Sequence, residues 1–444
     1  MADAGRVPLP RTFWWFLAAG AVSWLGDGVI VVGFPLLAAS LHASPVGIAA
    51  VVVSERLAPM LLALPLGALA DRWNARRTAA ATNVAQAALF SGAAALVAAG
   101  HLGLAGLIVV AFAANALGTL FSCATGALLA DVVRPEHFAS ANTWLRASNA
   151  LIAYVVGPGV GGLLYATGRQ LPLLVDACSF VAAAGVLAVL RTPGQRQRPA
   201  RADRRRFLDE TLDGIRIALS SGTFRVMTIF QCVMVAAQAG SVAAIVVLGT
   251  RVVGLSKAGF GWSLAAGNIA AVAVMLSLPR LRTLRASSTV VLSICLGAVG
   301  ELLIGLAHSG PQISVGLAMD GASALIVGVT LGTVRLRLVP REQLGRMTGG
   351  FQAMVYGAGA AGTMIGGLLA GLSGRAPYLT CATVYTLMAL TMGRWIKALD
   401  AESGPVGLPE KKVPGQAVAT PAASGAPAGA AASQAAAESA VAGD

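Results

Sequence analysis

The sequence predicts an all-α membrane protein with twelve transmembrane helices. The chain of 444 residues is 56% hydrophobic and only 11% charged, whereas soluble globular domains are about 25% charged. Its apolar runs are long and unbroken, as at 104–130, unlike the short alternating segments of a membrane barrel. Without the tail beyond about Asp400, twelve units of about 33 residues remain, each enough for one span and a short loop. A soluble globule is excluded.

Apolar windows of about twenty residues place the individual spans. The predicted spans are 13–39, 46–70, 78–99, 103–129, 141–166, 171–190, 224–250, 258–279, 287–307, 312–334, 347–373 and 377–396. The first span is too long for the core of a signal peptide and has no evident cleavage site, so we expect it to remain in the membrane.

The basic residues predict the orientation. With both termini on one side, that side carries 27 of the 32 lysines and arginines, and the other side carries four. Basic residues concentrate in cytoplasmic loops, so both termini are expected in the cytoplasm. The net charge of +13 is therefore interpreted as a signal of topology, and no nucleic-acid partner is expected.

One long polar connection divides the chain into six spans and six spans. Within residues 191–222, Leu208, Leu212, Ile215 and Leu219 recur at helical spacing, which predicts an amphipathic helix on the inner leaflet or against the bundle. A tether is the simpler interpretation, and a regulatory site is the alternative. The tail is rich in Ala, Gly, Pro and Ser, a composition typical of disorder. The expected parts are a six-helix bundle over 1–190, a cytoplasmic linker over 191–223, a second six-helix bundle over 224–398 and a disordered cytoplasmic tail over 399–444.

An internal repeat supports this division. The segment from Val133 to Gly168 resembles the one from Leu338 to Ser373 at an offset of 205 residues, so that Pro135 corresponds to Pro340. The Gly-Gly-Leu-Leu segment at 161–164 likewise corresponds to the one at 366–369. Two related bundles around a central cavity, with alternating access, follow naturally from such a duplication.

No cofactor, metal or catalytic site is expected, and neither is enzyme activity. The five cysteines stand singly in apolar stretches without metal-binding spacing, so we interpret each as a small buried hydrophobic residue. The chain contains no Gly-Lys-Ser/Thr segment, which disfavours ATP as its energy source.

The loop after the second span carries a family resemblance. Residues 67–77 read GALADRWNARR and resemble the G-x-L-a-D-R-x-x-R-R loop of the major facilitator superfamily. The resemblance implies the fold of that superfamily, and it implies that the loop stabilises the outward-facing state. Its implied gating residues are Gly67, Asp71, Arg72, Arg76 and Arg77, with Gly67 allowing close helix approach. A topology anchor alone is the alternative.

The fifth span carries a second resemblance. GPGVGG at 157–162 is similar to the GPxxGG signature of the proton-driven exporters of this superfamily, which implies efflux. Gly157, Gly161 and Gly162 permit close helix packing, and Pro158 removes one backbone hydrogen bond, so the span can bend. Packing without a role in coupling is the alternative.

Two further segments resemble the branch that holds enterobactin exporters and macrolide efflux proteins of the bacterial inner membrane. They are Ser23–Leu41 and Leu173–Phe180. The chain departs from the superfamily in two places. Its fourth span lacks the intramembrane arginine, and the second-half counterpart of the Asp-Arg loop is reduced to PRLRTLR at 279–285.

Six ionisable residues fall inside predicted spans, where a charge costs about 2.5–3.5 kcal/mol at the bilayer centre. Counting residues from the outer ends of the first two spans puts Asp27 and Arg56 at similar depths, which predicts that they pair, with Glu55 on another face. Asp27, Glu55 and Asp320 are the candidate proton carriers, with structural ion pairs or hydrogen bonds as the alternative. By resemblance the third, sixth, ninth and twelfth spans are peripheral, so Asp176 and Glu301 are interpreted as structural.

Uncharged polar residues inside the spans predict the lining of a cavity. Gln231 and Gln238 share a helical face, being seven positions apart. With many alanines around them, such residues suit an amphipathic organic ligand, although interhelical hydrogen bonds are an equal explanation. The remaining candidates are Asn115, Asn149, Tyr154, Asn268, Gln352 and Tyr356.

Together these features predict a proton-coupled exporter of an amphipathic small molecule, such as an antibiotic, a siderophore or a secondary metabolite. We expect it to work as a monomer in the inner membrane. Its expected partners are the lipid bilayer, protons and the substrate. An uptake symporter and a non-transporting receptor or scaffold remain the alternatives.

Overall fold

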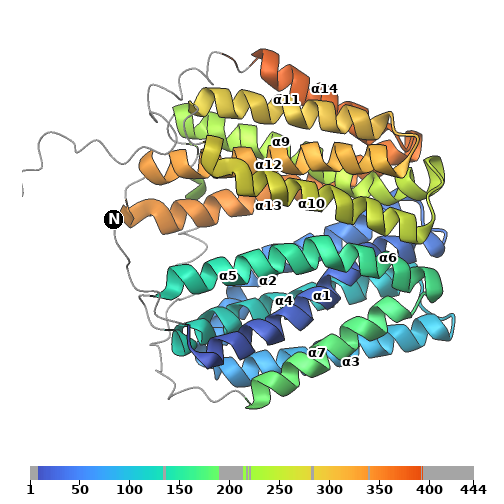
Figure 1. Ribbon diagram of the computed structural model, residues 1–444, viewed down its shortest axis with the longest axis vertical. Helices are drawn as coiled ribbons and strands as arrows, with labels where there is room; N and C mark the ends of the chain where they lie inside the picture. The colour runs from blue at the N-terminus through green and yellow to red at the C-terminus, as the bar shows by residue number, and fades with distance from the viewer. Residues whose placement is uncertain are drawn as a thin grey trace, which may run out of the picture. The chain divides into compact units, whose positions relative to one another are not determined.

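The structure is a computed structural model, and its described residues belong to one compact unit ending at Val406. It describes residues 9–133, 137–189, 214–216, 219, 222–281, 285–338, 341–391 and 393. All of the regular structure in this part is helical (Figure 1). An all-helical arrangement is what a bilayer requires, because a helix satisfies its backbone hydrogen bonds within one segment.

The first half of the chain contributes helices α1 to α7. The fifth span is a composite in which a π-helical turn, η2, interrupts the α-helix immediately before Pro158. Since proline has no N–H group to donate to the preceding turn, the local change in hydrogen bonding falls at this point. The helices are α1 Arg11–Ser40, α2 Pro45–Arg72, α3 Ala75–Ala98, α4 Leu104–Val132, α5 Phe138–Leu151, η2 Ile152–Val156, α6 Gly157–Thr167 and α7 Leu171–Val189.

The second half contributes helices α9 to α14. Here another π-helical turn, η3, ends the seventh span. The helices are α9 Gly222–Val247, η3 Leu248–Val252, α10 Lys257–Leu281, α11 Ala286–Gly305, α12 Gly310–Leu338, α13 Arg341–Leu372 and α14 Ala376–Thr391.

Every predicted span falls on a described helix. Ten helices in the described part are long and apolar enough to cross a membrane by themselves. Helix α14 is described for 16 residues, fewer than the roughly 20 that a bilayer needs. The architecture is that of an all-α membrane protein, as predicted.

Helices of the same half pack together, and two pairs of helices make the most extensive contacts between the halves. Within the halves, α2 packs on α4, α3 on α7, α11 on α12 and α9 on α13. Across the halves, α6 packs on α10 and α2 packs on α13. These two cross-contacts correspond to each other, because the internal repeat relates the fifth span to the eleventh and the second span to the eighth.

Glycines of the repeated motif make contacts within each half and contacts between the halves. A methyl group at Gly161 would lie 2.6 Å from the carbonyl oxygen of Val29 on α1, and one at Gly162 would lie 2.9 Å from Gly261 Cα on α10. In the second copy, Gly366 faces Gly240 on α9 and Gly367 faces Ala49 on α2. The first glycine of each pair therefore packs within its own half, and the second packs against the other half.

The halves meet at one end of the membrane spans, which we call the sealed end. It carries the loops at 41–44, 168–170 and 253–256, on the right in Figure 1. An Arg251 Nη2 group donates to the Ala43 carbonyl oxygen over 2.9 Å, and Lys257 Nζ lies 5.4 Å from the centre of the Tyr165 ring. Both contacts join the second half to the first.

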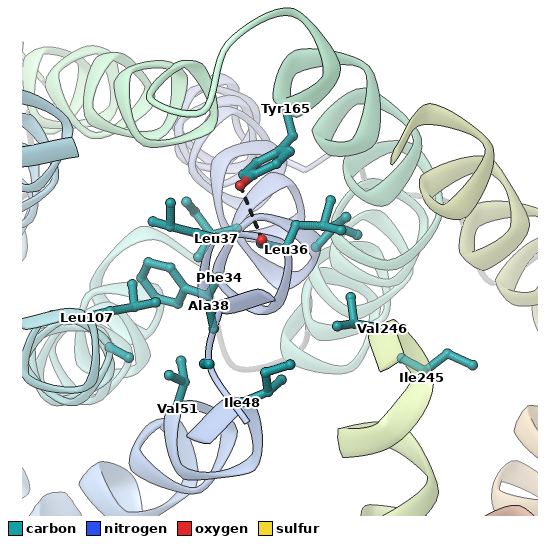
Figure 2. Close-up of a cluster of buried hydrophobic side chains, with 14 of the residues drawn as sticks. Phe34, Leu36, Leu37, Ala38, Ile48, Val51, Leu107, Tyr165, Ile245 and Val246 are labelled. Atoms are coloured by element: carbon teal, nitrogen blue, oxygen red, sulfur yellow. Dashed lines mark hydrogen bonds between the residues drawn. The ribbon is translucent and has the colours of Figure 1, made fainter. Parts of the chain in front are cut away.

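A hydrophobic cluster supports the sealed end from inside. Figure 2 shows Phe34, Leu37 and Leu107 of the first half in the same cluster as Ile245 and Val246 of α9. The buried Tyr165 hydroxyl donates to the Leu36 carbonyl oxygen over 3.1 Å, which satisfies a polar group within this apolar region.

Several expectations lie wholly or partly outside the described residues. Of the predicted amphipathic linker helix, only 214–216 and 219 are described, and Gly214 and Ile215 pack against Gly350 of α13. The tail over 399–444 lies outside the described part. The prediction that every cysteine is buried is wrong, since Cys178 and Cys295 are exposed. A thiol is apolar enough to be tolerated on a surface that faces lipid.

We predict that Gly366→Ala destabilises the fold, because the added methyl group would overlap the backbone of Gly240. Overpacking of this kind costs about 1–3 kcal/mol. The measurement is the thermal unfolding of the purified full chain in detergent. Gly185→Ala is the control, since a methyl group there meets no atom within 4 Å. Equal melting temperatures for the two variants would refute the close approach.

Candidate functional site

Two cavities meet at Asp27. The larger one, of about 640 Å³, is lined by residues of α1, α2, α3, α4, η2 and α7 and by Tyr356 of α13. We call it the mixed cavity, because both halves of the chain line it. The smaller one, of about 490 Å³, is lined entirely by the first half and is called the first-half cavity. Asp27, Gln86, Gly118 and Ser122 line both cavities.

Asp27 projects from the middle of α1, which is otherwise an apolar helix. Its side chain is exposed to the cavities, although both neighbours, Gly26 and Gly28, are buried. These glycines let other segments come close on either side. Gly26 leaves room for the Asp176 carboxyl group, and Gly28 leaves room for the backbone of Ala153 in η2. Asp27 is thus an acid in a protein-lined space rather than one that faces lipid.

Asp176 of α7 lies beside Asp27, although the resemblance makes its helix peripheral. A structural role for this residue stays a prediction. Its carboxyl group interacts electrostatically with Asp27 and helps to line the mixed cavity, although the residue is only 1% exposed. The Ser179 hydroxyl donates to Asp176 Oδ1 over 3.2 Å. A peripheral helix reaches the cavity here because α7 packs directly on α1.

The predicted Asp27–Arg56 pair is absent from the described part of the chain. Arg56 instead interacts electrostatically with Glu55 and with Tyr356, and its Nη1 atom lies 3.2 Å from where a Cβ atom at Gly359 would be. Similar depth would bring Asp27 and Arg56 together only if the consecutive helices α1 and α2 packed closely on each other. Helix α2 packs mainly on α4 and α13 and touches α1 little.

Glu55 and Tyr356 bring the two halves together at the mixed cavity. Both residues line it, one from α2 and the other from α13, and Arg56 lies between these two helices. Tyr356 is 44% exposed, so its ring is available to a ligand. Three acids line this cavity, Asp27, Glu55 and Asp176. Glu55 differs from the other two because an arginine, Arg56, follows it directly in the sequence.

A second pair of acids occupies the second half. Gln238 Nε2 donates to Asp320 Oδ2 over 2.8 Å, and the Ser241 hydroxyl donates to Glu301 Oε2 over 2.8 Å. Asp320 is 6% exposed and Glu301 is 1% exposed. Neither residue lines the mixed cavity or the first-half cavity. Asp320, a predicted proton carrier, thus lies outside these two cavities, and Glu301, predicted to be structural, is its neighbour.

Some of the other predicted polar residues line one of the two cavities, and the rest line neither. Asn115, Tyr154 and Tyr356 line the mixed cavity, and Asn149 lines the first-half cavity. Asn268 of α10 instead donates to the Tyr154 carbonyl oxygen in η2 over 2.6 Å, a hydrogen bond between the halves. Gln231 and Gln352 line neither of these cavities.

Two amides that the sequence reasoning did not single out lie close to the acids. Gln86 of α3 is 4% exposed and lines both cavities. Within the described part of the chain its buried Oε1 atom has no hydrogen-bond partner. Asn83, one turn earlier, is fully buried, and neither of its side-chain polar atoms has a partner there. Their spacing of three on an apolar helix was the signal that could have identified them.

The predicted gating loop is described in part. Asn74 caps α3 by accepting from Arg77 N over 3.0 Å, and Arg76 Nη1 donates to the Ala188 carbonyl oxygen on α7 over 3.4 Å. The side chains of Asp71 and Arg72 lie outside the described part. Among the described residues, a methyl group at Gly67 would meet Cys123 Sγ at 3.9 Å. This is ordinary contact, so the described residues show no close approach at Gly67, and its role in gating stays a prediction.

The described residues contain no group of three His, Cys, Asp or Glu side chains able to hold a metal ion. What the arrangement offers is a set of carboxyl groups at membrane depth beside a cavity lined from both halves. With the related halves and their two corresponding contacts, this arrangement defines a membrane transporter with the major facilitator fold.

Comparisons with known proteins agree with this class. Residues 6–424 match the family model described as transmembrane secretion effector. The chain belongs to this family, within the major facilitator superfamily.

Curated relatives cover part of the chain. The Multidrug efflux pump Tap of Mycobacterium tuberculosis H37Rv is 32% identical over 186 residues, which is 40% of this chain and 44% of that protein. The protein of the same name from Mycolicibacterium fortuitum is 30% identical over 202 residues, 44% of this chain and 48% of that protein. The chain thus spans less than half the length of these relatives.

Solved structures share the fold. A mutant form of the nucleoside transporter NupG superposes with a TM-score of 0.71 at 13% identity, over 88% of this chain and all of the other. An inward-facing bacterial homologue of the iron transporter ferroportin gives a TM-score of 0.68 at 16% identity, over 88% of this chain and 99% of the other. At such identities the likeness concerns the fold alone.

We predict that a cysteine at position 27 reacts with a small, water-soluble thiol reagent, whereas one at position 176 reacts at least several-fold more slowly. Asp27 is exposed to the cavities, and Asp176 is 1% exposed behind Gly26. The reaction requires a thiolate in contact with water. The variants Asp27→Cys and Asp176→Cys are compared in a background without the five native cysteines, with labelling followed by mass spectrometry. Equal protection of both sites would contradict the assignment of the cavity.

Proposed function

We propose that this protein is a proton-coupled antiporter that exports an amphipathic small molecule from the bacterial cytoplasm by alternating access. It works as a monomer, with both termini in the cytoplasm. The observation that carries the proposal is the position of Asp27, an exposed carboxyl group inside an apolar helix where two cavities meet.

The chemistry of the site supports exchange. Asp27 has no basic partner in the described part of the chain, and Asp176 beside it is also an acid. Carboxyl groups at membrane depth require compensation, and a proton or a polar group of the substrate supplies it. A proton and the substrate exclude each other from the site. Each change of the open end therefore carries either the proton or the substrate across the membrane. This competition makes the transport an exchange.

The packing supports alternating access. The halves touch through glycines, through polar contacts such as Arg251 with Ala43 and Asn268 with Tyr154, and through the hydrophobic cluster at the sealed end. The glycine and polar contacts can separate without breaking covalent or extensive hydrogen-bonded links. In the proposed cycle, residues 1–190 and 224–398 move as two bundles joined by the linker over 191–223. The π-helical turn η2 adjoins Gly157 and Pro158, a position suited to a hinge.

The lining of the mixed cavity supports an amphipathic organic substrate. Phe34, Phe90, Tyr154 and Tyr356 supply apolar and aromatic surface, while Asp27, Glu55, Gln86, Asn115 and Asp176 supply a small number of polar groups. Cavities of several hundred Å³ with this balance hold drug-sized molecules. Efflux, rather than uptake, is supported by the GPGVGG segment and by the relatives named as multidrug efflux pumps. Antibiotics, siderophores and secondary metabolites are the proposed substrate types.

Transport in inside-out membrane vesicles tests the proposal. An acidified lumen should drive accumulation of fluorescent ethidium or of a member of a panel of macrolides and siderophores. We predict that Asp27→Asn lowers this accumulation at least tenfold, because an amide cannot exchange a proton at this site. The amount of protein in the membrane should not change.

Val22→Ala is the matched control, since Val22 lies on the same helix, is 41% exposed and lines neither cavity. Accumulation by this variant should equal that of the original protein. Accumulation driven by a gradient of the opposite sign would establish uptake instead. If no member of the panel moves under either gradient, the transport proposal is wrong.

A further inference from the structure

The acid pair of the second half lies where α11 and α12 come unusually close. A methyl group at Gly300 would lie 2.7 Å from the Gly316 carbonyl oxygen and 2.9 Å from the backbone nitrogen of Asp320. Glu301 directly follows Gly300, so this approach brings the two acids together. Their carboxyl groups interact electrostatically, and both residues are more than nine-tenths buried.

The hydrogen bonds of the pair are incomplete. Ser241 and Gln238 of α9 donate to Glu301 and Asp320. The Cys381 thiol of α14 also hydrogen-bonds Glu301. Asp320 Oδ1 is buried and has no hydrogen-bond partner among the residues that the structure describes. A buried carboxylate oxygen without a donor is costly, so the structure is one donor short at this atom.

The surroundings offer no positive charge. The titratable groups that interact with the pair are Cys381, Tyr378 and Tyr385, all on α14. The Tyr378 hydroxyl is already used, because it donates to the Ser241 carbonyl oxygen over 3.0 Å. No lysine, arginine or histidine contacts the pair in the described part of the chain. Two adjacent carboxylates in such a place cannot both be ionised.

We infer that Glu301 and Asp320 share one bound proton and form a second proton site, separate from the mixed cavity. The proton supplies the missing donor of the pair. A metal ion fits less well, because Ser241 and Gln238 present hydrogen-bond donors to the carboxyl groups rather than oxygen ligands to a shared centre. The inference deepens the proposed function and rests on it only where the proton is said to be transported.

The two acid pairs do not correspond residue for residue through the internal repeat. At the offset of 205 residues, Asp320 corresponds to Asn115 and Glu301 to Leu96. Each half nevertheless holds an acid pair at the contact of its first or fourth helix with a peripheral helix. The pair of the first half borders the mixed cavity, whereas the pair of the second half is sealed in this state. Exchange of its proton therefore requires the change of state, which links the proton to the transport cycle.

Infrared spectroscopy of the purified full chain tests for the proton directly. A protonated carboxyl group has a carbonyl stretching band that disappears on ionisation, and we expect Asp320→Asn to lose one such band at neutral pH. The asparagine N–H group supplies the missing donor, so this variant should keep the melting temperature of the original protein. Asp320→Glu, which restores a carboxyl group, should regain the band. Asp27→Asn should leave this band in place.

An unchanged spectrum in Asp320→Asn would overturn the inference. A band that Na⁺ removes at constant pH would overturn it as well, by showing a cation site instead. Both results are independent of transport, so they distinguish failure of this inference from failure of the proposed function.

Proteoliposomes test whether the second proton is transported. Ethidium entry is measured together with proton movement, reported by a trapped pH-sensitive dye. We expect Asp320→Asn to move about one proton fewer for each ethidium than the original protein. An unchanged ratio would show that the second half contributes no transported proton. If the original protein moves no ethidium under a pH gradient, the transport proposal fails for this probe, and the infrared result alone decides whether the proton is bound.

Discussion

The cost of keeping carboxyl groups inside apolar helices governs the organisation of this protein. Each ionised acid at membrane depth costs about 2.5–3.5 kcal/mol on insertion scales, so each must be in contact with water, a donor, a cation or a proton. The acidic side chains that the structure describes all lie within the spans: Asp27, Glu55, Asp176, Glu301 and Asp320. The protein meets the cost in different ways. Asp27 faces cavities, Glu55 has Arg56 beside it, and the pair in the second half relies on Ser241 and Gln238.

Small residues make the arrangement of the halves possible. Between apolar helices in a bilayer there is no hydrophobic driving force, so close packing decides which helices associate. Gly161 and Gly366 hold their helices within each half, while Gly162 and Gly367 bring the halves together. One duplicated pair of glycines therefore builds both the bundles and the contacts between them. The glycine contacts between the halves are compact. Hydrogen bonds between the halves, such as the one from Asn268 to the Tyr154 carbonyl oxygen, accompany them.

The sequence predicted the helices well because the bilayer sets both their length and their composition. It also predicted the repeat and the glycine contacts at 157–162, since a glycine motif indicates close packing whatever its partner is. It predicted the neighbours of the acids poorly. Periodicity gives the depth and the helical face of a residue, but it does not say which helix lies opposite that face. Arg56 was assigned to Asp27 from depth alone, but α2 packs on α13, where Arg56 meets Tyr356. The resemblance makes the helices of Asp176 and Glu301 peripheral, but it does not predict their acidic neighbours, which they meet because α7 packs on α1 and α11 packs on α12. In each case the missing information was the packing between helices.

The proposed antiport requires that the binding of a proton or of substrate at Asp27 be coupled to the opening of the sealed end. Spin labels on Thr167→Cys and Ser256→Cys, two exposed residues on opposite halves at the sealed end, report this opening as a distance. The account predicts a second, longer distance whose population changes between acidic and alkaline media, and no such change when Asp27→Asn is added. A single distance at every pH, or an unchanged response in the Asp27→Asn variant, would contradict it.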